Sequence, residues 1–539
     1  MAISPLTKSL SVRANGDRTL GGLGLLLAGI LMGLWPAWPL AWVSLVPLWW
    51  VVHRGDGLRR SAWAGLIWGV GYHGTLLAWV LHLHPLTWLG VPWLGSIAIA
   101  IAAYAFVTLW GAALAVCWAM AMVGLQRWAP IGNTIDPMGR VLVGMALWCG
   151  LEALWSCGPL YGTSLAITQS PGNLVIVHLA RLSGHLTITA AIVVVNGFLA
   201  LAIDSQPRRW LTMAVGVFAI AHLVGWGLYQ QPLQDSSDNA INIGIIQGNI
   251  PSREKLTYRG VRRAEDVYRN NYRLLAQQGA DAVLTPEGAL PKLWSPETSL
   301  FNDVVQEAGV PLWLGTFTVV PGEQRHIYQS LVEITPRGTT PDNNPVNTQS
   351  NNQNNNQYNS QYNKIKLVPL GEYIPLQSLL GELISRLSPI GTDMLPGLPD
   401  QRFETAVGPA AVGICYDSAY GWIFRRQVAQ GGEFILTASN NDPYPRRMMA
   451  QHYGHDVIQA IATDRWAARS TNTGLSAVVD PHGHRHWMSE PQTFDAQLKT
   501  IYRRQTRTLY VRWGDWLVPG LLLVSGVWVW RLRWLNGLN

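Results

Sequence analysis

Residues 96–124, SIAIAIAAYAFVTLWGAALAVCWAMAMVG, contain neither a charged side chain nor a proline. An apolar run of about 20 residues is long enough to cross the hydrocarbon core of a bilayer as a helix. The surrounding interval from Arg60 to Arg127 holds no other Asp, Glu, Lys or Arg, and the same is true between Arg18 and Arg54. We therefore predict an integral membrane protein with an α-helical bundle.

Similar apolar segments recur along the chain and predict eight membrane spans. The first is not expected to be a cleaved signal peptide, because Trp35-Pro36 leads straight into a second apolar run. We expect a seven-span membrane domain over 1–229, a linker over 230–240, and the last span with its tail over 506–539. The eight spans are expected near 19–35, 37–53, 61–83, 96–124, 141–160, 178–203, 210–229 and 514–532.

Lys and Arg in the short loops indicate the orientation of these spans. With eight spans, the short loops that carry these residues all fall on one side, and such residues favour the cytoplasm. Both termini are then cytoplasmic, and the long segment between spans seven and eight is extracytoplasmic. The net charge of +7 favours anionic lipid as a partner over nucleic acid, for which the chain shows no motif.

The long segment, 241–505, has the pattern of a layered α/β domain. Short apolar runs rich in β-branched residues alternate with helical patterns, which indicates strands separated by helices. Within it, the Asn/Gln-rich stretch 341–363 is too poor in apolar residues to order itself, so we expect a disordered insertion. The strand-like runs are 241–247, 281–286, 311–319, 327–334, 410–415, 433–438 and 474–480, and the helical patterns lie near 259–279, 297–309, 418–430 and 448–466.

Three reactive side chains of this domain lie at or near the end of a strand-like run. Glu287 occurs in LTPEG (284–288), Lys364 begins KIKLVP (364–369), and Cys415 occurs in VGICYD (412–417). A cysteine between a strand and a helix is well placed as a nucleophile, since a helix N-terminus favours its thiolate. A carboxylate can remove the thiol proton, and a lysine can stabilise a tetrahedral oxyanion. Together the three predict acyl-transfer chemistry without histidine.

Each of these residues also has an ordinary structural interpretation. A single cysteine at a strand end is more often a small buried hydrophobe, Glu287 could be a cap or surface carboxylate, and Lys364 a solvated loop residue. Lys366 is a rival for any role of Lys364. Five histidines of this domain lack spacings that suggest a metal site, and we expect surface or turn roles for them: His452, His455, His482, His484 and His486.

Three sequence blocks resemble the signatures of the apolipoprotein N-acyltransferase family, the membrane branch of the nitrilase superfamily. They are TPEGALP (285–291), KIKLVPLGEYIP (364–375) and GICYD (413–417). The resemblance covers nearly the whole chain and implies a nitrilase-like α-β-β-α sandwich between spans seven and eight. Further similar blocks are IQGNIP (246–251), ASN (438–440), STNTGLSA (470–477) and TLYVRWGDW (508–516).

The resemblance implies roles for individual residues. Glu287 matches the general base, Lys364 the oxyanion stabiliser and Cys415 the nucleophile, while Glu372 matches a second essential carboxylate and Tyr416 follows the nucleophile. The implied reaction moves an acyl chain from a phospholipid onto the cysteine as a thioester. The chain then passes to the α-amine of the diacylglyceryl-cysteine of an apolipoprotein, at the extracytoplasmic face of a bacterial cytoplasmic (inner) membrane. No metal or dissociable cofactor is implied.

The sequence departs from the family pattern at several positions. Asp417 stands where the family typically has Glu, Lys366 replaces a common His, and Leu256 lies where a functional Trp is often found. These changes bear on substrate preference more than on the three central residues. Two alternatives remain open: a membrane-tethered amidase with the same three residues, and a non-catalytic lipoprotein-binding membrane protein.

Overall fold

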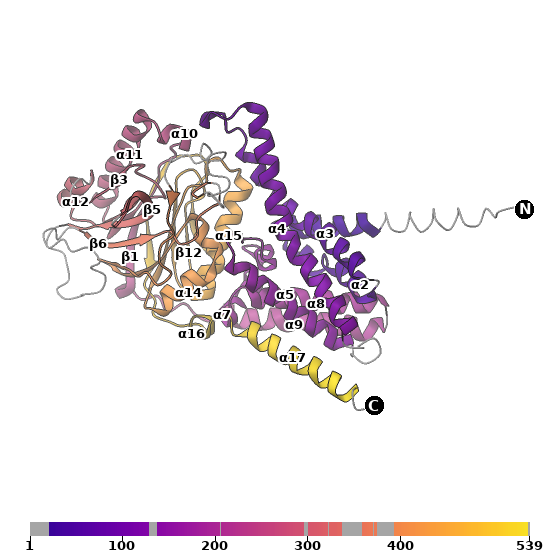
Figure 1. Ribbon diagram of the computed structural model, residues 1–539. Helices are drawn as coiled ribbons and strands as arrows, with labels where there is room; N and C mark the ends of the chain where they lie inside the picture. Colours follow the sequence, from indigo (N-terminus) through magenta and orange to yellow (C-terminus); the bar gives the residue numbers. More distant parts are fainter. Residues whose placement is uncertain are drawn as a thin grey trace, which may run out of the picture.

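The fold comprises a helix bundle and an α/β sandwich that lie side by side (Figure 1). They are described from a computed structural model of the chain. The structure describes residues 21–55, 57–128, 137–204, 206–295, 300–321, 323–336, 358–369, 371–373 and 393–536.

Helices occupy all eight regions where spans are expected. Within the described residues, four of them (α4, α5, α8 and α9) are long and apolar enough to cross a membrane. The chain is therefore a membrane protein by this measure, and the count of eight spans stays a prediction. The helices of these regions are Gly21–Gly33, α2 (Val46–Arg54), α3 (Leu58–Leu76), α4 (Trp93–Trp128), α5 (Pro137–Cys157), α8 (Leu186–Asp204), α9 (Pro207–Tyr229) and α17 (Leu517–Asn536).

Three of the expected spans are interrupted. The segment 61–83 divides at Leu77 into α3 and a 3-10 helix, η2 (Ala78–Leu83). The segment 37–53 divides into a 3-10 helix, η1 (Trp38–Trp42), and α2, and each has a proline in its first turn, where the missing N–H costs nothing. The segment 178–203 divides because the short helix α7 (Ala180–Ser183) ends at Gly184, whose φ is 68°. A left-handed glycine ends a helix, so α8 begins anew beyond it.

Close contact between α3 and α4 holds the centre of the bundle together. Two glycines four residues apart on α3, Gly65 and Gly69, face small residues on α4. A Cβ added to Gly69 would lie 2.7 Å from the Cα of Ala112, and one added to Gly65 would lie 2.6 Å from the carbonyl oxygen of Ala115. Small residues at this spacing let two helix backbones approach and pack closely within a membrane.

Replacing Gly69 with leucine should separate these helices. We expect the free energy of unfolding to fall by about 1–3 kcal/mol or more, because the new side chain meets backbone that has little room to move. Thermal unfolding in detergent measures the change. The matched control is Gly124→Leu on α4, since a Cβ there meets nothing within 4 Å. Equal unfolding midpoints for the two variants would contradict the packing argument.

The α/β domain consists of two sheets packed face to face. Between the sheets, the rings of Trp313 and Phe434 lie 6.0 Å apart. One sheet has eight strands: six follow the order β14-β1-β2-β4-β5-β6, while β3 pairs with β4 and β7 pairs with β5. The other sheet has six strands in the order β13-β12-β11-β10-β9-β8. The first sheet holds β1 (Ala240–Gln247), β2 (Ala282–Leu284), β3 (Leu293–Trp294), β4 (Leu312–Val320), β5 (Glu323–Ile334), β6 (Tyr358–Asn363), β7 (Asp393–Met394) and β14 (Asp495–Tyr502). The second holds β8 (Phe403–Thr405), β9 (Gly408–Ile414), β10 (Phe434–Ser439), β11 (Ala467–Thr471), β12 (Ala477–Val479) and β13 (Arg485–Met488).

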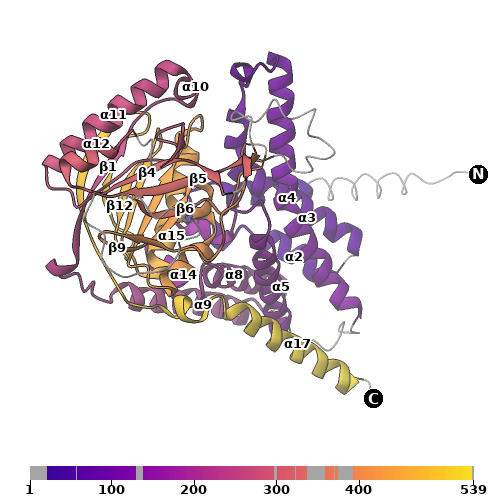
Figure 2. The ribbon, with the colours of Figure 1, turned by 60° about the vertical axis from the view of Figure 1, so that its left-hand side comes forward.

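Helices cover the outer face of each sheet, which completes the layers. Helices α11 (Tyr258–Gln277) and α12 (Asn302–Ala308) flank the first sheet, while α14 (Gly421–Ala429) and α15 (Arg446–Thr463) flank the second. Figure 2 shows α14 and α15 on the side of the sandwich that meets the helix bundle. This arrangement confirms the predicted α-β-β-α sandwich and places the second sheet's helices at the membrane side.

The expected disordered insertion is too long at its C-terminal end. Residues 341–357 lie outside the described residues, but 358–363 form β6, so the prediction is wrong for that part. Strand β6 pairs antiparallel with β5, and Tyr362 is fully buried. Pairing with the edge of an existing sheet satisfies the backbone of this polar segment, which composition alone does not reveal.

Candidate active site

The three predicted residues follow three strands whose carboxyl ends meet in the middle of the domain. Glu287 lies three residues beyond β2, Lys364 follows β6 directly, and Cys415 follows β9 directly. The two sheets supply different members of the set, so only their packing brings these side chains together.

The side chain of Lys364 lies at the centre of this site and is fully buried. Its Nζ donates to Glu287 Oε1 over 2.9 Å and to Glu372 Oε1 over 2.5 Å. Burial on its own would lower the pKa of Lys364, but the two carboxylates, with Cys415 nearby, hold that pKa well above its usual value. Lys364 is therefore a fixed positive charge within the site.

Glu287 is held on both of its carboxylate oxygens. While Oε1 accepts from Lys364, Oε2 accepts from the backbone N–H of Asn440 over 2.9 Å. The loop that carries Glu287 passes close to β4: a Cβ on Gly315 would lie 2.0 Å from the carbonyl oxygen of Pro286. Only glycine permits this approach, which fixes the position of the carboxylate.

Cys415 sits in a constrained backbone conformation at the end of β9. Its φ is 50°, in the left-handed region, and its Sγ lies 3.9 Å from the carbonyl oxygen of Asn440. Non-glycine residues in this region cost about 1–3 kcal/mol and cluster at functional sites. Burial, with the charge of Glu287, raises the pKa of the Cys415 thiol, although Lys364 opposes this. The resting group is therefore a thiol that needs a base.

The expected helix after Cys415 is not continuous with the strand. A 3-10 helix of 5 residues, η8 (Cys415–Ala419), comes first, and α14 begins only at Gly421. The prediction that a helix N-terminus favours the thiolate is therefore wrong here, since so short a helix has little dipole. Activation of the thiol is left to Glu287 and Lys364.

Asp417 joins the nucleophile turn to the segment that carries the lysine. Its side chain is fully buried and accepts from the backbone N–H groups of Ile414 (3.0 Å) and Lys366 (2.7 Å) and from the hydroxyl of Tyr362 (3.1 Å). Burial, opposed by these backbone hydrogen bonds, raises the pKa of Asp417 to about 6. The shorter Asp thus acts by holding the end of β6 and the segment after it against the turn that follows β9, rather than by reaching Cys415.

Asp417→Ala should loosen both segments. Each buried donor left without an acceptor costs about 1–3 kcal/mol, so we expect a fall in unfolding free energy of more than about 3 kcal/mol. Alkylation of Cys415 by iodoacetamide should become faster as the turn opens. Asp417→Asn is the matched control, since it keeps the size of the side chain and one acceptor oxygen. If the Ala variant matched wild type in both measurements, Asp417 would have no positioning role.

Tyr416 points away from the lysine and toward the helix bundle. Its hydroxyl donates to the carbonyl oxygen of Tyr161 over 2.6 Å and accepts from the N–H of Tyr161 over 2.7 Å. Tyr161 lies in the loop that follows α5, so the residue after Cys415 anchors the site to the membrane helices.

Lys366, the rival lysine, lies outside the site. Its Nζ donates to the carbonyl oxygens of Cys157 and Gly158, each over 3.3 Å, at the end of α5. The geometry therefore selects Lys364 for the cation beside Glu287 and Cys415. Leu256, at the other position that departs from the family pattern, is 44% exposed.

One residue that the sequence analysis did not single out, Lys255, belongs to the surroundings of the site. Lys255 is buried, and its Nζ would lie 3.7 Å from a Cβ added to Gly288, beside Glu287. Burial lowers the pKa of Lys255 to about 8, although Glu287 and Asp442 oppose this. Its place four residues beyond the IQGNIP block is the one signal in the sequence that points to it.

The surface role expected for His452 is wrong. This residue lies buried on α15, where its Nε2 donates to the carbonyl oxygen of Cys415 over 2.7 Å and its Nδ1 accepts from Asn441 over 2.9 Å. Burial, with Arg469 nearby, holds the pKa of His452 well below its usual value, so the ring is neutral. It supports the backbone of the nucleophile. Across the described part of the chain, His, Cys, Asp and Glu form no cluster of three or more that could hold a metal ion.

Two family models match successive parts of the chain. Residues 23–198 match the family model of the apolipoprotein N-acyltransferase N-terminal domain, and residues 243–493 match that of carbon-nitrogen hydrolase. The chain is 43% identical to an apolipoprotein N-acyltransferase from Nostoc sp. over 95% of its own length and 99% of the relative's. It is also 43% identical to the protein of that name from Thermosynechococcus vestitus, over 95% of each chain. A third such protein, from Synechocystis sp., is 40% identical over 91% of this chain and 96% of its own.

Proposed function

Because this chain belongs to the apolipoprotein N-acyltransferase family, we propose that it transfers an acyl chain from a phospholipid to the N-terminal amine of a diacylglyceryl apolipoprotein. It is an acyltransferase of the nitrilase superfamily. The observation that carries the proposal is the buried contact between Lys364 and Glu287 beside the Cys415 turn. Glu372 completes the neighbourhood of the lysine.

In the first half-reaction, Glu287 takes the proton of the Cys415 thiol as Sγ attacks the ester carbonyl of the phospholipid. Lys364 stabilises the oxyanion of the tetrahedral intermediate. Collapse breaks the ester C–O bond, and the departing alkoxide takes the proton back from Glu287. The products are a lysophospholipid and a Cys415 thioester, and no cofactor takes part.

In the second half-reaction, the α-amine of the acceptor attacks the thioester carbonyl. Glu287 takes the amine proton, the C–S bond breaks, and the thiolate of Cys415 is protonated again. The product is an N-acylated lipoprotein with an amide bond. The reaction thus follows a ping-pong order in which each substrate uses the same three side chains.

Contacts between the site and the helix bundle support lipid-anchored substrates. Tyr444 is half-buried near Cys415, and its ring meets Trp79 edge-on with centroids 4.9 Å apart. Nearby, Gln451 donates to the carbonyl oxygen of Leu76 over 3.2 Å, at the end of α3. A site bordered by apolar helix ends suits a donor and an acceptor that both remain in the bilayer.

The test is an acyl-transfer assay with the full chain in detergent. With phospholipid and a diacylated lipopeptide bearing a free N-terminus, mass spectrometry should find the lipopeptide heavier by one acyl chain. An acetylated N-terminus is the control and should remain unchanged. Release of free fatty acid at the same rate with and without lipopeptide would overturn the transferase proposal in favour of a hydrolase.

We also propose that 241–505 is a catalytic domain on the extracytoplasmic face of the inner membrane, between the seven-span domain 1–229 and the last span. Reporter fusions after residues 56, 132, 206 and 539 should give cytoplasmic signals, and a fusion after residue 300 should give an extracytoplasmic one. The distribution of Lys and Arg in the short loops is the physical reason. A cytoplasmic signal at residue 300 would contradict this placement.

A further inference from the structure

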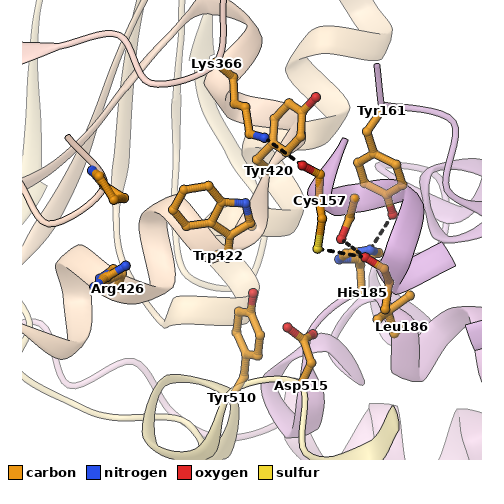
Figure 3. Close-up of a pocket in the computed structure, with 14 residues that line it drawn as sticks. Cys157, Tyr161, His185, Leu186, Lys366, Tyr420, Trp422, Arg426, Tyr510 and Asp515 are labelled. Atoms are coloured by element: carbon orange, nitrogen blue, oxygen red, sulfur yellow. Dashed lines mark hydrogen bonds between the residues drawn. The ribbon is translucent and has the colours of Figure 1, made fainter. Parts of the chain in front are cut away.

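A cavity lies where the helix bundle meets the sandwich (Figure 3). Its volume is about 450 Å³, and it is bounded by the end of α5, the start of α8, helix α14 and the short helix α16 (Leu509–Trp513). Its walls combine apolar side chains of the membrane helices, Ala153 and Leu186, with aromatic and basic side chains of the sandwich.

This cavity is separate from the Cys415 site. None of Glu287, Lys364 and Cys415 lines it. The turn that begins at Cys415 lies between the two, and Tyr420, near the end of that turn, forms part of the cavity wall. The cavity therefore needs an occupant other than the reacting ester.

Two cations lie on one side of the cavity. Lys366 stands over the ring of Tyr420, with Nζ 4.5 Å from the centroid, and Arg426 is exposed on α14. Figure 3 shows Trp422 between them and Asp515 beside Tyr510, away from Lys366. No carboxylate in the described part of the chain forms an ion pair with either cation. The hydrogen bonds from Lys366 to the carbonyl oxygens of Cys157 and Gly158 leave its positive charge unneutralised.

The cavity lies at the ends of two candidate membrane spans. Helices α5 and α8 are long and apolar enough to span a membrane, and the cavity opens where both reach the sandwich. Trp513 and Trp516, beside Asp515, are 65% and 41% exposed, and exposed tryptophans are typical of the interface between hydrocarbon and water. A lysine ammonium and an arginine guanidinium both bind phosphate through charge-assisted hydrogen bonds.

We propose that this cavity binds the phosphate headgroup of an anionic membrane phospholipid, and that Lys366 and Arg426, on either side of Trp422, supply the positive charge that attracts it. The acyl chains extend along the apolar ends of α5 and α8, and the aromatic walls cover the glycerol. Asp515 repels a phosphate on its own side, which confines the headgroup to the basic side. The bound lipid joins the two parts of the protein and is not itself the substrate, so the inference does not depend on the chemistry of Cys415.

Native mass spectrometry of the full chain in detergent tests the proposal. A Cys415→Ala background prevents consumption of lipid, and the probe is phosphatidylglycerol. We expect the background protein to retain one more phosphatidylglycerol than the same protein with Lys366→Gln and Arg426→Gln, and the affinity for that lipid to fall by about tenfold or more, as charge-assisted hydrogen bonds are lost. Arg262→Gln with Lys499→Gln, two basic residues outside the cavity, is the matched control.

Alkylation of Cys157 gives a second measurement without altering the cations. This free, exposed cysteine lines the cavity, whereas Cys117, also exposed, lies outside it on α4. Phosphatidylglycerol should slow maleimide labelling of Cys157 and leave Cys117 unaffected. Arg426→Gln alone changes only an exposed side chain and should weaken this protection without loss of thermal stability.

Three results would overturn the proposal. Equal lipid retention in the cavity variant and the control would show that the cations do not hold the lipid. If diacylglycerol with the same acyl chains protected Cys157 equally well, the headgroup would not be what the cavity recognises. Protection by millimolar inorganic phosphate alone would mark a site for free phosphate rather than for lipid.

Discussion

Incubation of the purified chain with phospholipid alone should add one fatty-acyl mass to the peptide that contains Cys415. The acceptor amine is absent, and the site is buried enough to keep water from the thioester, so the adduct should accumulate. Neutral hydroxylamine should remove it, and a diacylated lipopeptide should discharge it with formation of an N-acylated product. Peptide mass spectrometry follows each step.

Cys415→Ala should show neither loading nor transfer, a complete loss rather than a reduction. Cys157→Ala is the matched control, because that cysteine is exposed and lies outside the reactive site; it should load as wild type does. An acyl adduct that persists in Cys415→Ala, or one found on another cysteine, would refute the assignment of the nucleophile.

Replacement of Lys364 by methionine should reduce the rate of Cys415 loading by about 10²–10³-fold, the usual cost of removing an oxyanion donor. The slower loading of Cys415 should have a second cause in this structure. Lys364 is the buried cation between Glu287 and Glu372, and without it two carboxylates confront each other in a site of low polarity. Their mutual repulsion should raise the pKa of at least one of them and leave less carboxylate to accept the thiol proton.

Single-turnover loading measured against pH separates these effects. In Lys364→Met the residual rate should rise toward higher pH than in wild type, because the Cys415 thiol loses the cation that lowers its pKa. Lys499→Met, on strand β14, is the matched control and should load at the wild-type rate. A Lys364→Met variant that loads within a few-fold of wild type at all pH values would show that the oxyanion has another partner.

Composition and local patterns were enough for much of the fold. Charge-free apolar runs located the helices of the bundle, since a bilayer imposes length and hydropathy on any segment that crosses it. Apolar β-branched runs located the long strands such as β1, β4 and β10. Polar edge strands were not recognisable: β6 lies in an Asn-rich segment and exists because β5 offers it a backbone to pair with.

The sequence by itself determined that this protein has a membrane bundle, an α-β-β-α sandwich and three candidate reactive residues at strand ends. Only the tertiary structure decided between Lys364 and Lys366, because two lysines on either side of one residue point to different places: one between two carboxylates, the other to the end of α5. It also shows that His452, which the sequence analysis expects at the surface, is buried against the carbonyl oxygen of Cys415. Such choices depend on contacts between segments far apart in the chain, and local sequence periodicity carries no information about them.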